Sequence, residues 1–119
     1  MSPTFEETTP PVTRTQIVRF AGAAGDFNPM HHDEPFAQAA GEETVFAMGQ
    51  LTAAILGEAV ARWLGRDAIT GYGVRFVGKV VPGDVLVLRG TPADQPGRYD
   101  LTVTRESDAT VVLTGWATH

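Results

Sequence analysis

The chain has 119 residues, with 14 acidic and 9 basic side chains, a formal net charge of −5 and no cysteine. A hydrophobic fraction of 43% with 19% charged residues is typical of a folded chain, and this length favours a single domain over residues 1–119. The acidic balance disfavours nucleic acid and anionic membranes as partners, and the lack of cysteine excludes disulfides, thiolate metal sites and a cysteine nucleophile.

The N-terminal segment M-S-P-T-F-E-E has neither a basic start nor an apolar core. It therefore predicts no secretory signal and a cytoplasmic location. Pro10 and Pro11 then favour an extended lead-in to the first helix. The longest apolar stretch, residues 51–64, is shorter than the roughly 20 residues of a membrane span, so we expect a buried helix there and no membrane partner.

Helical spacing of apolar residues predicts a short amphipathic helix from Thr15 to about Ala24, capped by Thr13 or Thr15 and ended by Gly25. Turn-forming residues then predict a loop over 25–32. Asp33 is a plausible cap for a second helix over residues 34–40.

A long apolar helix is predicted from Gly49 to Leu64, because only four long or polar side chains interrupt it. Its apolar surface extends most of the way round, so we expect it to be enclosed. Alternating or β-branched stretches then predict four strands joined by short turns, at residues 72–80, 85–88, 99–104 and 109–118. This order favours an α+β fold in which an antiparallel meander curls around the helix. Its open sheet edges predict a homodimer or a heterodimer.

The loop over residues 25–33 concentrates two histidines, two carboxylates and an amide. Asp26 and His31 lie five residues apart across a proline-containing turn, so both side chains can reach one point and activate a water molecule. Asn28 can tie the loop to backbone groups. A capping aspartate beside a hydrogen-bonded histidine explains the same residues structurally, and composition does not separate the two interpretations.

A metal site would use His31, His32 and Asp33, but adjacent side chains usually point apart and no second ligand group is present. Gly49 begins the long helix, where unpaired N–H groups can bind a substrate oxygen and a glycine allows close approach. Tight packing at the helix entrance would also explain that glycine. Glu58 could act as a base in thioester hydrolysis, although Arg62 four residues later favours an ion pair.

Five of the nine basic residues fall between positions 62 and 89. If the strands gathered these side chains, they could bind a phosphate-bearing arm of a substrate, whereas solvated strand faces are the structural alternative.

The loop G-D-F-N-P-M-H, residues 25–31, resembles the G-D-x-N-P-x-H signature of the MaoC-like R-specific enoyl-thioester hydratases and 3-hydroxyacyl-thioester dehydratases, which have the hot-dog fold. Residues 33–41 resemble the family's D-x-x-F-A-x-x-x-G segment, and residues 74–76 and 81–84 resemble its strand and turn. The likeness runs in order from about residue 15 to residue 88.

This resemblance implies that Asp26 and His31 activate water for syn addition to a trans-2-enoyl thioester of CoA or acyl carrier protein. It also implies that Asn28 supports the loop and that the Gly49 backbone N–H stabilises the thioester oxygen. No metal or redox cofactor is implied. The family usually has A-H-G-M at the start of the helix, whereas this chain has A-M-G-Q, so Met48 and Gln50 are expected to alter the pocket. Two alternatives remain: an acyl-binding or partner-dependent subunit, and a thioesterase that depends on Glu58.

Overall fold

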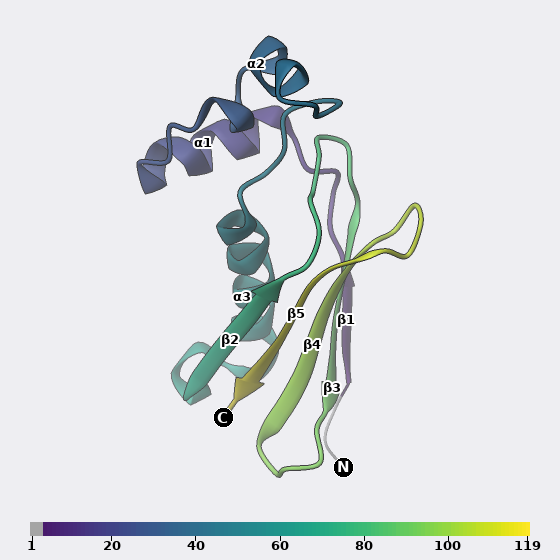
Figure 1. Cartoon of the computed structure of the whole chain (residues 1–119). Coiled ribbons are helices and arrows are strands. Elements are labelled where there is room, and N and C mark those ends of the chain that lie inside the picture. Colours follow the sequence, from purple (N-terminus) through teal and green to yellow (C-terminus); the bar gives the residue numbers. More distant parts are fainter. Residues whose placement is uncertain (1–3) are drawn as a thin grey trace.

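A five-stranded antiparallel sheet lies against one long helix, and two shorter helices sit beyond the end of that helix (Figure 1). The computed structural model describes residues 4–119, so residues 1–3 of the segment assessed above for a signal lie outside the described part. The elements are β1 (Phe5–Thr8), α1 (Arg14–Ala24), a 3-10 turn (Pro29–His31), α2 (Glu34–Ala39), α3 (Gly49–Leu64), a second 3-10 turn (Arg66–Ala68), β2 (Gly71–Phe76), β3 (Leu86–Pro92), β4 (Arg98–Arg105) and β5 (Val111–Thr118).

The strand order β1-β3-β4-β5-β2 shows which part of the expected meander is right. Strands β3, β4 and β5 form consecutive hairpins, as predicted. Strand β2 does not pair with β3, because it crosses to the far side of the sheet and pairs with β5, with Gly73 opposite Trp116. The prediction of a simple four-strand meander is therefore wrong for β2. Residues 77–85 form a crossover, which contains the predicted turn at Pro82 and Gly83.

Strand β1 was not predicted from the sequence. It has only four residues, too few to show a pattern, and it exists because β3 offers it a free edge. An ion pair from Arg62 on α3 to Glu7 on β1, with Nη2 and Oε1 2.7 Å apart, adds a contact between this edge strand and the helix. Pro10 and Pro11 lie between β1 and α1, in a segment without regular secondary structure that leads into the first helix.

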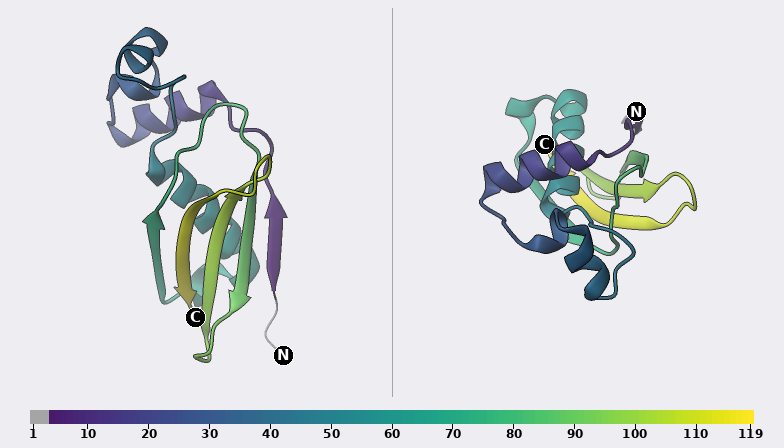
Figure 2. Two further views of the ribbon diagram at one scale, coloured as in Figure 1. Left: turned by 45° about the vertical axis from the view of Figure 1, so that its right-hand side comes forward. Right: turned by 90° about the horizontal axis from the view of Figure 1, so that it is seen from above.

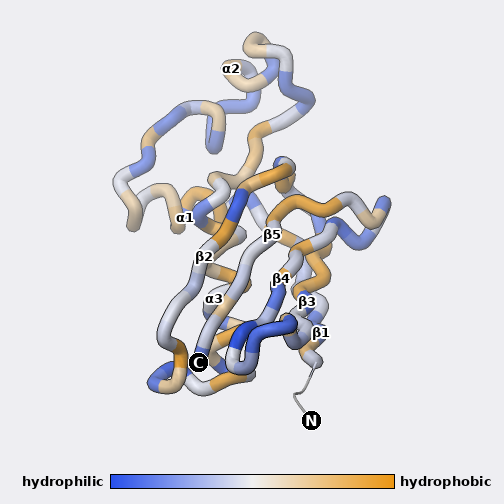
Figure 3. Tube along the Cα trace, turned by 60° about the horizontal axis from the view of Figure 1, so that its bottom comes forward, coloured by the Kyte–Doolittle hydropathy of each residue, from blue (hydrophilic) through white to orange (hydrophobic). Residues whose placement is uncertain are grey.

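Helix α3 packs its apolar side on the concave face of the sheet. Its most buried residues are Leu51, Thr52, Ala53, Leu56, Ala59 and Val60. Ala54 and Glu58 on the opposite side are exposed, so the expectation of full enclosure is wrong for this single chain. White and orange predominate along α3 and the strands, whereas α1, α2 and their loop alternate between hydrophilic and hydrophobic segments (Figure 3). Within residues 4–119, no helix is both long enough and apolar enough to cross a membrane.

Helices α1 and α2 form a layer over the amino-terminal end of α3 (Figure 2). Their predicted ends are confirmed, since Thr13 caps α1, Gly25 ends it with a φ of 72° and Asp33 caps α2. Glu34 ties this layer together because its carboxylate accepts hydrogen bonds from Thr44 and from the backbone N–H of Val45, and pairs with Arg14 at 2.7 Å.

Glu34 is expected to make the stability of this layer depend on pH. The hydrogen bond from Thr44, followed by those from Val45 and Arg14, holds the pKa of Glu34 below its ordinary value of 4.5. A lowered pKa in the folded state stabilises the fold above the unfolded pKa, and this contribution is lost as the pH falls through the folded pKa. Glu34→Gln should therefore lower Tm at neutral pH, and the difference from wild type should narrow in acid.

Melting curves of both proteins across this pH range provide the measurement. Glu43→Gln is the matched control, because the Glu43 carboxylate makes none of these contacts. If the difference in Tm between wild type and Glu34→Gln stayed constant from neutral to acidic pH, this role of Glu34 would be contradicted.

Candidate active site

The loop between α1 and α2 is folded by its own side chains. The Asp26 carboxylate accepts a hydrogen bond from the backbone N–H of Asn28 at 3.3 Å, and the Asn28 side-chain oxygen accepts one from the N–H of Met30 at 3.0 Å. Asn28 thereby caps the short 3-10 turn that carries His31. Such aspartate and asparagine turns hold the backbone without help from regular secondary structure. The predicted tie from Asn28 to the backbone is confirmed, while its proposed part in catalysis stays a prediction.

The turn brings His31 and Asp26 together, as the five-residue spacing predicted. Their Nε2 and Oδ2 atoms lie 3.5 Å apart, which is longer than a direct N–H···O hydrogen bond. His31 is buried, with 7% of its surface exposed, whereas 39% of the Asp26 side chain faces solvent. His31 is therefore packed inside the molecule, whereas the Asp26 carboxylate can be reached from solvent.

The backbone carbonyl of Phe46 fixes the orientation of the His31 ring. It lies 2.7 Å from Nδ1, and a carbonyl oxygen can only accept, so Nδ1 carries the proton. In the neutral ring, Nε2 is then an acceptor that faces the Asp26 carboxylate. Two proton acceptors 3.5 Å apart can both bind the hydrogens of one water molecule.

A second layer of contacts supports Phe46. Its ring meets the His31 ring edge-on, with centroids 5.3 Å apart, and the ammonium of Lys79 lies 4.7 Å from its centroid while pairing with Glu42. Sequence reasoning missed Phe46, because any residue type supplies a backbone carbonyl and only the fold shows where it points.

Gly49 is the first residue of α3, where the predicted helix entrance is confirmed. Its N-cap is Met48, which is buried and provides no side-chain hydrogen bond to the first turn. An N–H group at this end of the helix can bind an oxygen that carries negative charge. Gly49 also has a packing role, because a Cβ built on it would lie 2.7 Å from the ring of Phe76. Gln50, the other departure from the family pattern, is exposed.

Several residues considered from the sequence lie outside this cluster. Glu58 is 75% exposed at its side chain and pairs with Arg62 at 3.3 Å, so the ion-pair interpretation is confirmed and nothing here supports a base. The basic side chains between residues 62 and 89 are not gathered, since Arg62, Lys79 and Arg89 pair with acidic residues in different places. In residues 4–119, no three His, Asp or Glu side chains are arranged to hold a metal ion.

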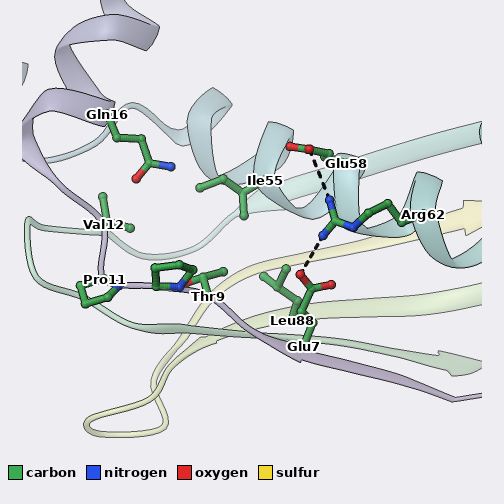
Figure 4. Close-up of a pocket in the computed structure, with 10 residues that line it drawn as sticks. Glu7, Thr9, Pro11, Val12, Gln16, Ile55, Glu58, Arg62 and Leu88 are labelled. Carbon is green, nitrogen blue, oxygen red and sulfur yellow. Dashed lines mark hydrogen bonds and ion pairs between the residues drawn. The ribbon is translucent and has the colours of Figure 1, made fainter.

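Two hollows lie beside α1 and α3. One, of about 210 Å³, lies between β1 and α3 and contains the Glu7–Arg62–Glu58 ion pairs (Figure 4). The other, of about 420 Å³, is lined by α1 and by Leu51 of α3. Neither is lined by Asp26 or His31, so this pair does not belong to these hollows.

Comparison with known proteins gives a consistent result. A family model described as MaoC like domain matches residues 2–113, and no curated protein matches. The R-hydratase PhaJ1 from Pseudomonas aeruginosa is 26% identical, with a TM-score of 0.81 over 97% of this chain and 77% of that one. An (R)-hydratase from A. caviae involved in PHA biosynthesis is 21% identical, with a TM-score of 0.79 over 97% and 91% of the two chains.

The ChsH1–ChsH2 complex from Mycobacterium tuberculosis is 23% identical, with a TM-score of 0.75 over 97% of this chain and 90% of that one. At these identities the A. caviae and M. tuberculosis structures support the fold alone.

Proposed function

The chain belongs to the MaoC-like family and has the hot-dog fold, and on this basis we propose that it hydrates trans-2-enoyl thioesters or dehydrates (3R)-hydroxyacyl thioesters. The observation that carries the proposal is the Asp26–His31 pair, held 3.5 Å apart with the ring fixed by the Phe46 carbonyl. The similarity to the R-hydratase PhaJ1 supports the same reaction class. The acyl group is carried by CoA or acyl carrier protein.

The reaction needs three groups, and the site offers candidates for each. Asp26 and His31 bind one water molecule, whose oxygen bonds to the β-carbon while one of its protons passes to the pair. That proton is then delivered to the α-carbon on the same face, and the double bond becomes a single bond. Negative charge develops on the thioester oxygen between these steps, and the Gly49 N–H stabilises it. An enzyme accelerates both directions of this equilibrium, so the pathway determines the physiological direction.

The direct test is the loss of enoyl absorbance when purified protein is mixed with crotonyl-CoA or with a longer trans-2-enoyl-CoA. Hydration that yields the (3R)-hydroxyacyl product supports the proposal. A folded protein that hydrates neither substrate would favour the alternative of an acyl-binding or partner-dependent subunit. Release of free thiol from a saturated acyl-CoA would instead indicate a thioesterase.

We also expect the chain to dimerise through the β2 edge of its sheet. Strand β2 ends the sheet order, so its outer backbone groups face no other strand within residues 4–119. Aromatic and aliphatic side chains are exposed along it. Pairing two such edges would continue the sheet and cover those side chains. Light scattering should give twice the chain mass of 12.7 kDa.

Two valines that are equally exposed provide a matched comparison. Val77 directly follows β2 and Val18 lies on α1, and each is 50% exposed. Val77→Asp should shift the mass toward one chain, whereas Val18→Asp should not. Wild-type protein that ran as a single 12.7 kDa species would contradict the dimer.

A further inference from the structure

The crossover over residues 77–85 passes beside the loop that leads from α2 into α3 (Figure 1). The backbones of the two segments are joined by a hydrogen bond, because the Ala47 N–H donates to the Val80 carbonyl at 2.8 Å. Their side chains are also joined, since the ammonium of Lys79 pairs with the Glu42 carboxylate. The crossover carries none of the residues proposed to touch the substrate, but it contacts the loop that leads to Gly49.

The peptide group between Phe46 and Ala47 is held at both of its ends. Its oxygen accepts the hydrogen bond from Nδ1 of His31 at 2.7 Å, and its N–H is the group that donates to Val80. Because a peptide group is planar, these two hydrogen bonds together fix the direction in which the carbonyl points. The position of the proton on the His31 ring therefore depends on the crossover as well as on the loop.

Lys79 is the side chain of the crossover that holds the ring of Phe46. Its Nζ atom lies 4.7 Å from the ring centroid, within the roughly 6 Å at which a cation is attracted to an aromatic face. The same ring meets the His31 ring edge-on, with centroids 5.3 Å apart. The neighbouring Val80 is buried, so the backbone that carries Lys79 is fixed even though the Lys79 side chain is exposed.

We propose that Lys79 is a positioning residue, whose ammonium holds the Phe46 ring and thereby keeps the Phe46 carbonyl on Nδ1 of His31. This inference rests on the proposed hydration reaction and adds a residue that acts through the histidine without touching the substrate. Once the ring is released, the carbonyl moves away from Nδ1, and the tautomer with its proton on Nε2 gains population. In that tautomer Nε2 cannot accept a hydrogen bond from the reacting water.

Hydration kinetics with crotonyl-CoA provide the first test. Lys79→Met keeps a long side chain and removes its charge, so kcat should fall by about three- to tenfold. KM should change little, because Lys79 does not touch the substrate. Lys79→Arg keeps a cation that can stack on the ring and pair with a carboxylate, and it should restore most of kcat. Glu42→Gln removes only the partner of the ammonium, so its effect on kcat should be smaller.

Nitrogen NMR of the His31 ring is the second test, because the shifts of the two ring nitrogens report which of them carries the proton. The His31 signals are those that disappear in His31→Ala. At mildly alkaline pH, which favours neutral rings, wild type should carry the proton on Nδ1. Lys79→Met should shift the signals toward the form protonated on Nε2, and Lys79→Arg should match wild type.

Arg89→Met is the matched control for both measurements. It also removes an exposed cation from an ion pair, but that pair joins Arg89 on β3 to Glu6 on β1. Neither strand contacts His31 through the loop or the crossover described above. This variant should therefore keep the wild-type kcat and the wild-type tautomer.

The two measurements distinguish this inference from the proposed reaction. If Lys79→Met changes the tautomer in a protein that hydrates no enoyl thioester, the positioning role stands and the reaction fails. If folded Lys79→Met keeps the wild-type tautomer, or if Lys79→Met and Lys79→Arg lose kcat equally, the assignment of Lys79 is overturned while the reaction stands. Lys79→Gln replaces the methionine variant if that one does not fold.

Discussion

Replacing His31 with alanine will lower kcat/KM for crotonyl-CoA hydration by about 10³-fold, because it removes one of the two groups that hold and deprotonate water. Asp26→Asn should have an effect of similar size, since an amide keeps the shape of the carboxylate and cannot take a proton. The two groups act on one water molecule, so the double variant should be little worse than either single one. The loss of enoyl absorbance gives kcat/KM for the two single variants and for the double variant.

His32 provides the matched control for this experiment. It adjoins His31 in sequence, but it is exposed while His31 is buried, and His32→Ala should keep near-normal rates. Asp26→Asn also keeps an oxygen that can accept from the Asn28 N–H, so the loop should remain folded. Near-normal rates for both His31→Ala and Asp26→Asn in folded protein would remove the proposed mechanism.

The ends of α1 and α2 and the proximity of Asp26 to His31 were predictable because they depend on local contacts. Thr13 and Asp33 cap their helices through backbone groups three residues later, and Gly25 ends α1 in a conformation that favours glycine. The spacing of Asp26 and His31 likewise depends only on the turn between them. Each of these features can be read in a short window of sequence.

The features that could not be predicted depend on residues far apart in the chain. Strand β2 pairs with β5 because the intervening segment crosses the sheet, and no pattern within β2 specifies its partner. The Phe46 carbonyl reaches His31 across 15 residues, and its residue type gives no sign of that contact. The ring of Phe76 on β2 packs against Gly49 at the start of α3, and this contact also joins residues far apart in the chain. These are the contacts that fix the ring of His31 and border the proposed oxygen site.

Gly49→Pro will remove the proposed oxyanion donor while leaving the helix in place. Proline is tolerated at the first position of a helix, where its missing N–H is not needed for the helix ladder. Met48 has a φ of −66° and a ψ of 142°, the extended conformation that a residue before proline prefers. Since the loss of one such donor typically costs about 10²–10³-fold in rate, kcat should fall by that amount.

Gly49→Ala distinguishes the effect of the missing N–H on kcat from the effect of the added carbon atoms. It keeps the donor and introduces a Cβ that the half-exposed Phe76 ring must move to accommodate. Because side-chain ring atoms rather than backbone atoms block this Cβ, a small rotation of the ring makes room, and the alanine variant should retain more kcat than the proline variant. If both variants lost activity equally, the position of Phe76 rather than the N–H would explain the effect. A folded Gly49→Pro protein with wild-type kcat would show that the charge on the thioester oxygen is stabilised by another group.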